Sequence, residues 1–201
     1  MPDLLVSFQQ KLLEAGCDEA GRGCYAGPVF AAAVILPRHF HHPLLNDSKL
    51  LKPSVRLELR TYIEAHALAF SVAQVSVEEI DTINILKASQ KAMHIALASL
   101  KLTPEFIAVD GNYFLNYKTI PHACIVKGDG KFSNIAAASI LAKTYRDEYM
   151  QRIHSEFPQY NWASNKGYGT QEHRDAIKEN GICIYHRKSF NILPVQAALF
   201  E

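Results

Sequence analysis

Two acidic residues stand side by side in an otherwise apolar stretch near the start of the chain. Asp18 and Glu19 lie in G-C-D-E-A, residues 16–20, and a turn from Gly21 to Pro28 leads into P-V-F-A-A-A-V-I-L, residues 28–36. The second stretch is almost wholly apolar, which is typical of a central strand. Burying a carboxylate costs several kcal/mol unless its charge is compensated. The pattern therefore predicts two adjacent strands, the first of which carries acids that need a compensating partner.

The rest of the chain predicts strands followed by alternating helices and strands. Further strands are expected over residues 68–75, 106–110 and 122–127. Helices are expected over residues 54–66, from 77 to about 100, from about 133 through the run I-A-A-A-S-I-L-A-K-T-Y-R-D-E-Y-M, and from 171 to about 180. Residues 37–53 and 161–169 are expected to be loops. This order indicates an α/β protein with a mixed sheet and a helical C-terminal part.

Side chains that cap helices mark where the predicted helices begin and end. Ser54 is expected to cap the first helix, and Ser76 with Glu79 forms a capping box for the second. The remaining signals are Ser133 or Asn134, then Thr170, and finally Asn180-Gly181 as a helix end.

Composition limits the class of protein without defining its activity. The chain has 201 residues, of which 48% are hydrophobic and 20% charged, so it can bury one large core. It has no apolar run long enough to span a membrane and no visible secretory signal. Its four cysteines form no C-x-x-C pair, which favours reduced thiols and a cytoplasmic location. The net charge of +1 excludes bulk attraction to a polyanion, but eleven Lys and Arg against seven Asp and Glu over residues 116–188 leave room for a local basic patch.

Four acids share one kind of position in the predicted fold. Asp18, Glu19, Asp110 and Asp129 each lie in or just after an apolar strand, beside glycine. Ligands gather at strand ends in α/β sheets, and converging carboxylates need a cation. Oxygen ligands favour Mg²⁺ or Mn²⁺ over zinc, and a pair of such ions suits phosphodiester hydrolysis. The alternative is that some of these acids cap helices or form turns; G-D-G at residues 128–130 is a common turn.

Seven motifs together resemble one enzyme family. In order along residues 14–191 they are C-D-E-A-G-R-G-x-x-A-G-P-V, D-S-K-L, V-D-G-N, K-G-D-G, I-A-A-A-S-I-L-A-K-x-x-R-D, K-G-Y-G-T and H-R-K-S-F. This set is similar to ribonuclease HII. The resemblance implies the ribonuclease H-like α/β fold, a five-stranded mixed sheet flanked by helices. It also implies a single catalytic domain over residues 1–201, with residues from about 160 to 201 as a C-terminal helical segment completing the substrate groove.

The resemblance implies an activity and a substrate. The family cleaves the RNA strand of RNA–DNA hybrids and cuts duplex DNA 5′ to embedded ribonucleotides, by two-metal attack of water that leaves 3′-hydroxyl and 5′-phosphate ends. The expected partners are therefore these nucleic acids, with no membrane and no obligate protein partner. The expected role is ribonucleotide removal in replication and repair.

Residue by residue, the resemblance assigns metal binding and catalysis to four acids, Asp18, Glu19, Asp110 and Asp129. Gly21, Arg22 and Gly23 match the segment that reads the ribonucleotide 2′-hydroxyl through backbone groups, and glycine permits such an approach. Tyr168 matches the family tyrosine at the RNA–DNA junction. Lys49 resembles a phosphate-contacting position, with an ordinary loop lysine as the alternative.

Other residues keep two interpretations. Lys143 and Arg146 lie one helical turn apart and could face a phosphate backbone, or Arg146 could pair with nearby acids. Asp147 is expected to be a structural partner of Lys143. His39, His41 and His42 suggest a metal cluster, but a solvated loop is preferred. Trp162 and Tyr160 could stack on bases, but a place in the core is preferred.

Three rival functions remain. Ribonuclease HIII is disfavoured because only 17 residues precede Asp18 and because the glycine motif is G-R-G. A non-catalytic nucleic-acid-binding module is disfavoured because all four acids are present. A phosphatase acting on a small substrate is disfavoured by G-R-G and by the basic excess. The sequence leaves open the preferred metal, the oligomeric state, the preference between hybrids and embedded ribonucleotides, and protein partners.

Overall fold

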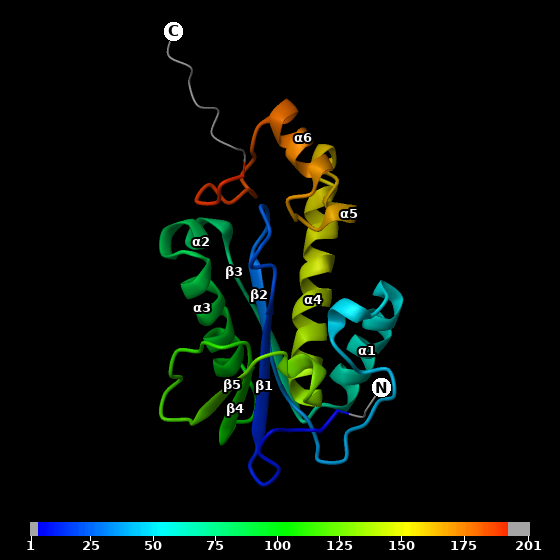
Figure 1. The fold of residues 1–201 in the computed structure, drawn as a ribbon, viewed down its shortest axis with the longest axis vertical. Helices are drawn as coiled ribbons and strands as arrows, with labels where there is room; N and C mark the ends of the chain where they lie inside the picture. Colours follow the sequence, from blue (N-terminus) through cyan, green and yellow to red (C-terminus); the bar gives the residue numbers. More distant parts are fainter. Residues whose placement is uncertain (1–3, 193–201) are drawn as a thin grey trace.

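One mixed sheet of five strands forms the centre of the computed structural model, which describes residues 4–192. The sheet order is β3-β2-β1-β4-β5 (Figure 1). The strands are β1 (Glu14–Ala20), β2 (Val29–Ile35), β3 (Ala69–Val75), β4 (Phe106–Asp110) and β5 (His122–Ile125). The predicted five-stranded mixed sheet is thus confirmed, and β2 is wholly buried as its apolar sequence predicts.

The register of the sheet places two acids side by side. β1 runs antiparallel to β2 and parallel to β4, while β4 runs parallel to β5. Cys17 of β1 lies opposite Val109 of β4. Asp18 and Asp110, the next residues on these two parallel neighbours, therefore lie side by side at the end of the sheet where ligands gather in α/β folds.

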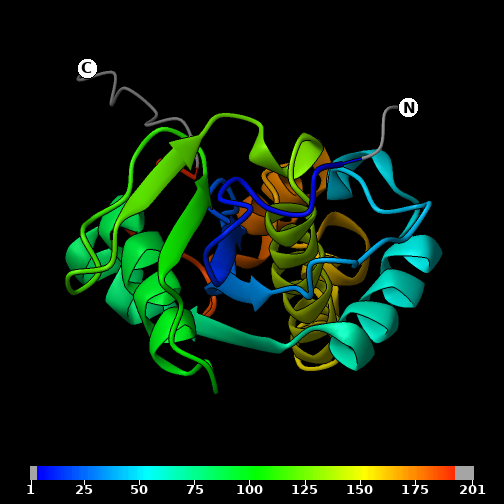
Figure 2. The same ribbon diagram turned by 90° about the horizontal axis from the view of Figure 1, so that it is seen from below.

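Helices cover both faces of the sheet (Figures 1 and 2). Helices α2 (Val77–Ile83) and α3 (Ile85–Ala98) pack on one face, around a core that includes Ala15, Met93 and Ile107. Helices α1 (Pro53–His66) and α4 (Ser133–His154) cover the other, where the small residues of α4 face the sheet. At Gly16 the backbone of α4 comes so close that an added Cβ would lie 2.3 Å from the carbonyl carbon of Asn134.

The C-terminal part packs against the far end of α4 (Figure 1). It contains a 3-10 turn, η3 (Pro158–Tyr160), and the helices α5 (Trp162–Asn165) and α6 (Gln171–Asn180). Tyr160 and Trp162 stack in its own apolar cluster with ring centroids 5.1 Å apart, so their predicted place in the core is confirmed. The end of the expected C-terminal segment, residues 193–201, lies outside the described residues.

Several predicted element boundaries are wrong. The helix predicted from residue 77 to about 100 is broken at Asn84, whose φ of +70° ends α2 and whose side chain caps α3. Helix α1 begins at Pro53 after Lys52, without a cap from Ser54, and α4 begins after Phe132, without a side-chain cap. Short helical turns, η1 (Ser48–Leu50) and α5, interrupt the two predicted loops. The caps at Ser76 and Thr170 are confirmed.

Candidate active site

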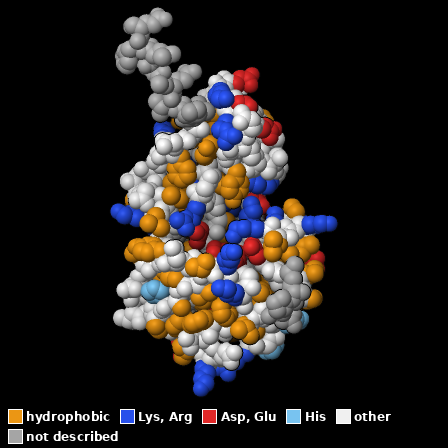
Figure 3. Space-filling model, in the orientation of Figure 1, with side chains coloured by type: hydrophobic (Ala, Val, Ile, Leu, Met, Phe, Trp, Pro, Cys, Tyr) orange, Lys and Arg blue, Asp and Glu red, His pale blue; other side chains and the backbone are white. Residues whose placement is uncertain are grey.

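Three carboxylates from distant parts of the sequence meet at the edge of the sheet. Asp18 comes from β1, Asp110 is the last residue of β4, and Asp129 lies in the turn η2 (Gly128–Gly130) that precedes α4. One oxygen from each lies within 4.8 Å of the others. Asp18 and Asp129 are buried, whereas Asp110 is half-buried. In Figure 3 Asp and Glu side chains occupy a recess in the middle of the face, with Lys and Arg side chains around it.

Hydrogen bonds fix two of the three carboxylates and leave the third short of a donor. Oδ1 of Asp110 accepts from the backbone N–H of Gly128 at 2.7 Å, which ties β4 to η2. Oδ1 of Asp18 accepts from the N–H of Glu19 at 2.7 Å. Oδ2 of Asp129 is buried without a hydrogen-bond donor, and its nearest cation is Nζ of Lys49 at 3.6 Å. A buried carboxylate oxygen without a donor fits a site that is completed by a cation.

The electrostatics of the three carboxylates also indicate a site that is completed by a cation. Burial raises the pKa of Asp18, and the charges of Glu19 and Asp110 raise it further. Burial, followed by the charge of Asp110, also raises the pKa of Asp129. Such shifts arise where carboxylates are crowded without enough positive charge. The donor set consists of oxygen atoms alone, which suits a hard divalent cation such as Mg²⁺ or Mn²⁺.

The fourth predicted acid, Glu19, points to a different partner. Its Oε1 accepts from Nη1 of Arg22 at 3.1 Å, and it is not part of the three-carboxylate cluster. Burial raises the pKa of Glu19 against the lowering effect of Arg22, and Asp110 contributes to the rise. Glu19 thus lies beside the cluster and is held by an exposed arginine.

The glycine-rich loop after β1 has two different kinds of glycine. Gly21 has a φ of +95°, and an added Cβ would meet Nε of Arg146 at 2.0 Å, so this glycine is required by the packing of the protein itself. Gly23 has no heavy atom within 4 Å of an added Cβ, so its backbone faces open space. Of the two, Gly23 is therefore the one whose missing side chain leaves room for a ligand.

Tyr168 lies next to this loop. It forms an isolated antiparallel bridge with Cys24, one residue after Gly23, and 42% of its surface is exposed. Nζ of Lys143 lies 5.7 Å from the centre of its ring. The structure therefore brings Tyr168, the glycine loop and Lys143 together on one side of the carboxylates.

Arg146 is not positioned to bind a substrate. It is fully buried and donates to the carbonyl oxygens of Ala26, Pro28 and Lys166 at 2.8–3.1 Å. Both sequence interpretations of Arg146 are therefore wrong, because its partners are backbone carbonyls and neither phosphates nor acids. Its guanidinium joins the turn before β2 to the C-terminal part.

Other predictions can be placed directly. Asp147 pairs with Lys143 at 2.6 Å, as expected, and also with Arg56 at 3.8 Å. His39 and His41 are exposed, and His42 packs against Tyr62, so the solvated-loop interpretation is confirmed. The four cysteines are free. Within residues 4–192 no helix is both long and apolar enough to cross a membrane.

Sequence reasoning missed two groups that support the site. Arg187, within H-R-K-S-F, is fully buried and donates to the carbonyls of Gly21, Arg22 and Gly27, which fixes the glycine loop. Ser139, on the face of α4 nearest Asp18, bonds to Ser48 at 2.9 Å and lowers the pKa of Asp18 against the larger effect of burial. Both lie in motifs that the sequence singled out, but neither has a local pattern that reveals its contact.

The family model for ribonuclease HII matches residues 15–193. The chain belongs to the ribonuclease HII family. It is 60% identical over 193 residues to the ribonuclease HII of Christiangramia forsetii, a match that covers 96% of this chain and 98% of that protein. The ribonuclease HII of Parabacteroides distasonis is 58% identical over 196 residues and is covered to 98%, as is this chain. The protein is therefore a ribonuclease HII, an endonuclease and hydrolase with a carboxylate cluster suited to a divalent metal.

Solved structures share the ribonuclease HII fold. A chain in the PCNA:RNase HII complex from Archaeoglobus fulgidus superposes with a TM-score of 0.76 at 26% identity, covering 94% of this chain and all of that one. The ribonuclease H2 of Pyrococcus horikoshii gives 0.74 at 24% identity, covering 89% and 94%. Bst-RNase HIII, solved in complex with Mn²⁺, gives 0.65 at 18% identity, covering 88% of this chain and 66% of that one.

Proposed function

We propose that this ribonuclease HII hydrolyses the RNA strand of RNA–DNA hybrids and cuts duplex DNA on the 5′ side of embedded ribonucleotides, leaving 3′-hydroxyl and 5′-phosphate ends. The observation that carries the proposal is the cluster of Asp18, Asp110 and Asp129, with oxygens within 4.8 Å, at the edge of the sheet. It lies beside a glycine loop whose Gly23 faces open space.

The three clustered carboxylates would hold the metal, with Glu19 as a fourth ligand once it leaves Arg22. The unpartnered Oδ2 of Asp129 and the raised pKa values of Asp18 and Asp129 support this assignment. When bound, two ions of Mg²⁺ or Mn²⁺ would supply Lewis acidity, which makes water a better nucleophile and stabilises the charge on the leaving oxygen. The carboxylates themselves orient these ions and balance their charge.

Recognition of the ribose falls to neighbouring groups. The backbone of Gly21, Arg22 and Gly23 would contact the 2′-hydroxyl, the group that separates RNA from DNA. Tyr168 would pack against the sugar at the RNA–DNA junction, because its exposed ring stands next to this loop. Lys49 would contact a phosphate: its side chain is 76% exposed and its ammonium already lies 3.6 Å from Asp129. The carboxylates, Asp129 first, raise the pKa of Lys49 although burial opposes this, so the lysine stays charged.

We infer that the enzyme works in the cytoplasm, as a single domain without an obligate protein partner, and removes ribonucleotides from DNA. Lys143 would assist by contacting the duplex near Tyr168, from which its ammonium is 5.7 Å away.

A DNA duplex with one ribonucleotide tests the proposal directly. We expect one cut on the 5′ side of the ribonucleotide in Mg²⁺ or Mn²⁺, no cut in EDTA, and no cut in a matched duplex of DNA alone. End analysis should find a 3′-hydroxyl and a 5′-phosphate. Cleavage on the 3′ side with a 2′,3′-cyclic phosphate would contradict the proposal, because the 2′-hydroxyl would then be the nucleophile.

Three variants test ribose recognition without disturbing the carboxylates. Gly23→Ala adds a methyl group to open space, so the protein should melt as the parent does, while cleavage of the embedded ribonucleotide falls at least tenfold, roughly the effect of losing a good polar contact. Tyr168→Ala should reduce the same cleavage more strongly than Tyr168→Phe, which keeps the ring. Parent-like cleavage by both Gly23→Ala and Tyr168→Ala would remove the glycine loop and Tyr168 from the recognition site.

A further inference from the structure

A cleft of about 810 Å³ lies between α1, α4 and α5, further along α4 than the carboxylates. Four cationic side chains, Arg56, Lys143, Arg152 and Lys166, line it together with two acids, Asp147 and Glu148. Two of these six are turned to partners at the rim. Glu148 pairs with Arg60 at 2.7 Å, and Arg152 lies over the ring of Tyr149 at 4.8 Å. The interior therefore contains three cations and one carboxylate.

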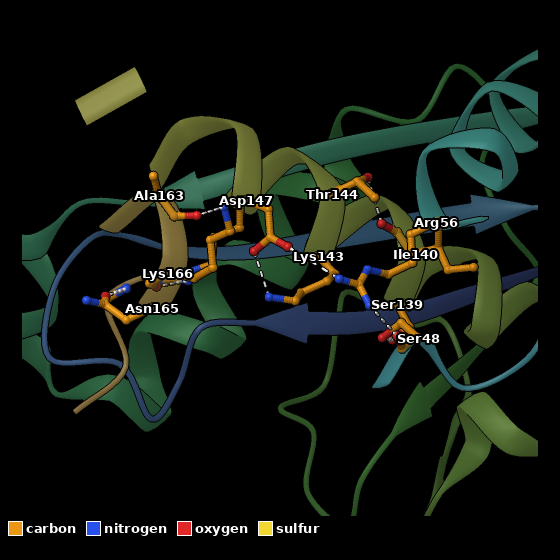
Figure 4. A network of polar contacts seen from close by, with 12 residues as sticks. Ser48, Arg56, Ser139, Ile140, Lys143, Thr144, Asp147, Ala163, Asn165 and Lys166 are labelled. Carbon is orange, nitrogen blue, oxygen red and sulfur yellow. Dashed lines mark hydrogen bonds and ion pairs between the residues drawn. The ribbon is translucent and has the colours of Figure 1, made fainter. Parts of the chain in front are cut away.

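That carboxylate, Asp147, holds two of the cations. Nζ of Lys143 lies 2.6 Å from Oδ1 and Nη2 of Arg56 lies 3.8 Å from Oδ2. Figure 4 shows Lys166 on the opposite side of Asp147 from Arg56, with its ammonium directed to the carbonyl of Ala163 at 2.6 Å. Asp147 is thus the one carboxylate among three cationic side chains, which come from α1, α4 and the residue after α5, and an anion can still be accommodated between them.

The backbone of Lys166 is fixed by the end of α5. Its φ of +52° is the left-handed conformation in which helices commonly end, and its N–H donates to the carbonyl of Trp162. Burial lowers the pKa of Lys166, and the positive charges of Lys143 and Arg56 lower it further against the effect of Asp147. The ammonium of Lys166 therefore lies where positive charge exceeds negative charge, which favours the binding of an anion.

The distance between the cleft and the active site indicates which part of a bound duplex the cleft would contact. Ser139 is the residue of α4 taken as the position of the active site, because it hydrogen-bonds to Ser48 and lowers the pKa of Asp18. Asp147 follows eight residues later, which is about 12 Å along the helix. On a duplex lying along α4 this spans three to four nucleotides, at about 3.4 Å per nucleotide of one strand. Lys143 lies between these two residues on the helix, and its ammonium is 5.7 Å from the centre of the Tyr168 ring.

We propose that the cleft binds a backbone phosphate of the duplex three to four nucleotides from the cleavage point. This phosphate takes over the ammonium of Lys166 and Nη2 of Arg56, whose Nη1 stays on the carbonyls of Ser48 and Leu51, while Asp147 keeps Lys143 in place. The inference rests on the proposed action on duplex nucleic acid, because it assigns a second contact of the same ligand. Arginine and lysine from different walls suit a phosphate, since Nη2 of the guanidinium and the ammonium can donate to different oxygens. Phosphate contacts of this kind position the duplex and add affinity independent of sequence.

Binding measurements with duplexes of different length test the proposal. The ligand is a 20-base-pair DNA duplex with one central ribonucleotide, in Ca²⁺ to limit cleavage, and two shorter duplexes each trimmed to two base pairs on one side. Lys166→Gln should weaken binding of the long duplex several-fold and reduce the slope of log affinity against log salt by about one. The matched control is Lys178→Gln, which removes the same charge from an exposed pair with Asp175 and should leave both unchanged.

The trimmed duplexes show whether the lost contact is distal. On one of them Lys166→Gln should bind as the parent does, because the phosphate that it contacts is gone; on the other the defect should persist. Asp147→Asn removes a negative charge from the cleft, so it should have the opposite effect to Lys166→Gln: tighter binding of the long duplex and a steeper dependence of affinity on salt. A variant that was merely misfolded would show neither change.

Two results would overturn the inference. One is parent-like binding of the long duplex by Lys166→Gln, and the other is an equal defect on all three duplexes. Either result, obtained with a parent enzyme that cuts the embedded ribonucleotide in Mg²⁺, rejects the cleft and leaves the proposed function intact. A parent enzyme that neither binds nor cuts the duplex rejects the proposed function.

Discussion

Arg187 donates a hydrogen bond of 2.7 Å to the carbonyl oxygen of Gly21, although 166 residues separate them along the chain. The same guanidinium donates to the carbonyls of Arg22 and Gly27. Arg187, a buried cation of the C-terminal part, thus fixes the conformation of the loop that is proposed to contact the ribose. Burial and the nearby charge of Arg146 lower the pKa of Arg187 to about 10, so the arginine remains charged at neutral pH.

Replacing this arginine should affect recognition and stability together. Arg187→Lys keeps the charge but cannot reach three carbonyls from a single ammonium, so we expect a loss of about 2–3 kcal/mol in the free energy of unfolding. Cleavage of an embedded ribonucleotide, measured well below the melting temperature of the variant, should fall at least tenfold, which is roughly 1.4 kcal/mol. Arg38→Lys, at an exposed arginine that bonds to the carbonyl of Lys11, is the control. Full activity of folded Arg187→Lys would contradict a positioning role.

Two aspartates near α4 should behave differently. Asp129→Asn removes a carboxylate of the cluster, so we expect cleavage to fall by more than about 100-fold, the upper range for losing an outer partner of a metal ligand. Asp147→Asn removes the partner of Lys143 and Arg56, so it should lower the melting temperature and keep cleavage within about tenfold of the parent. Rates are compared at a temperature where both are folded. An active Asp129→Asn beside an inactive Asp147→Asn would reverse the two roles.

The carboxylate cluster should cost stability when no metal is bound. Because the pKa values of Asp18 and Asp129 are raised, the folded state binds protons more tightly than the unfolded state, so at neutral pH these charges destabilise the fold. In EDTA, Asp18→Asn should therefore melt higher than the parent, by about 2–4 °C for each kcal/mol gained. Millimolar Mg²⁺ should raise the melting temperature of the parent and have a smaller effect on the variant. A variant that melts lower in EDTA would show that Asp18 stabilises the metal-free fold.

Acid should loosen the C-terminal part first. Nε2 of His173 accepts from the indole N–H of Trp162 at 3.0 Å and lies 3.2 Å from Nε2 of His186. Burial, and then the charge of His173, lower the pKa of His186 to about 4, and burial lowers the pKa of His173. Unfolded histidine titrates near 6.5, so this contribution to stability is complete above that pH and is lost as the pH falls towards about 4.

Trp162 is the only tryptophan in the chain, so its fluorescence reports on this cluster. The urea concentration at which half of the protein is unfolded should decrease as the pH is lowered from 6.5 to 4. His186→Gln should make this pH dependence weaker, whereas His39→Gln, at an exposed position, should leave it unchanged. An equal pH dependence in all three proteins would assign the acid effect to other groups.

The acids at strand ends were predictable because apolar strands and glycine turns are local patterns. Asp18 and Asp110 follow such patterns, and the parallel pairing of β1 with β4 then brings them together. The role of Arg146 was not predictable, since three carbonyls from two distant segments form its binding place only after the chain has folded. The break at Asn84 was hidden because the apolar spacing continues across it, while a single left-handed residue turns the helix.

Gly16 lies two residues before Asp18, in contact with the backbone of Asn134 at the start of α4. The turn that carries Asp129 leads directly into that helix. At this point the distance between β1 and α4 is consequently limited by contact between main-chain atoms, and it helps to set the distance between Asp18 and Asp129. The added methyl group of Gly16→Ala would collide with the backbone of α4 and increase the distance between Asp129 and Asp18, although neither acid is replaced. A residue that has no side chain and takes no part in the chemistry therefore constrains the geometry of the carboxylate cluster.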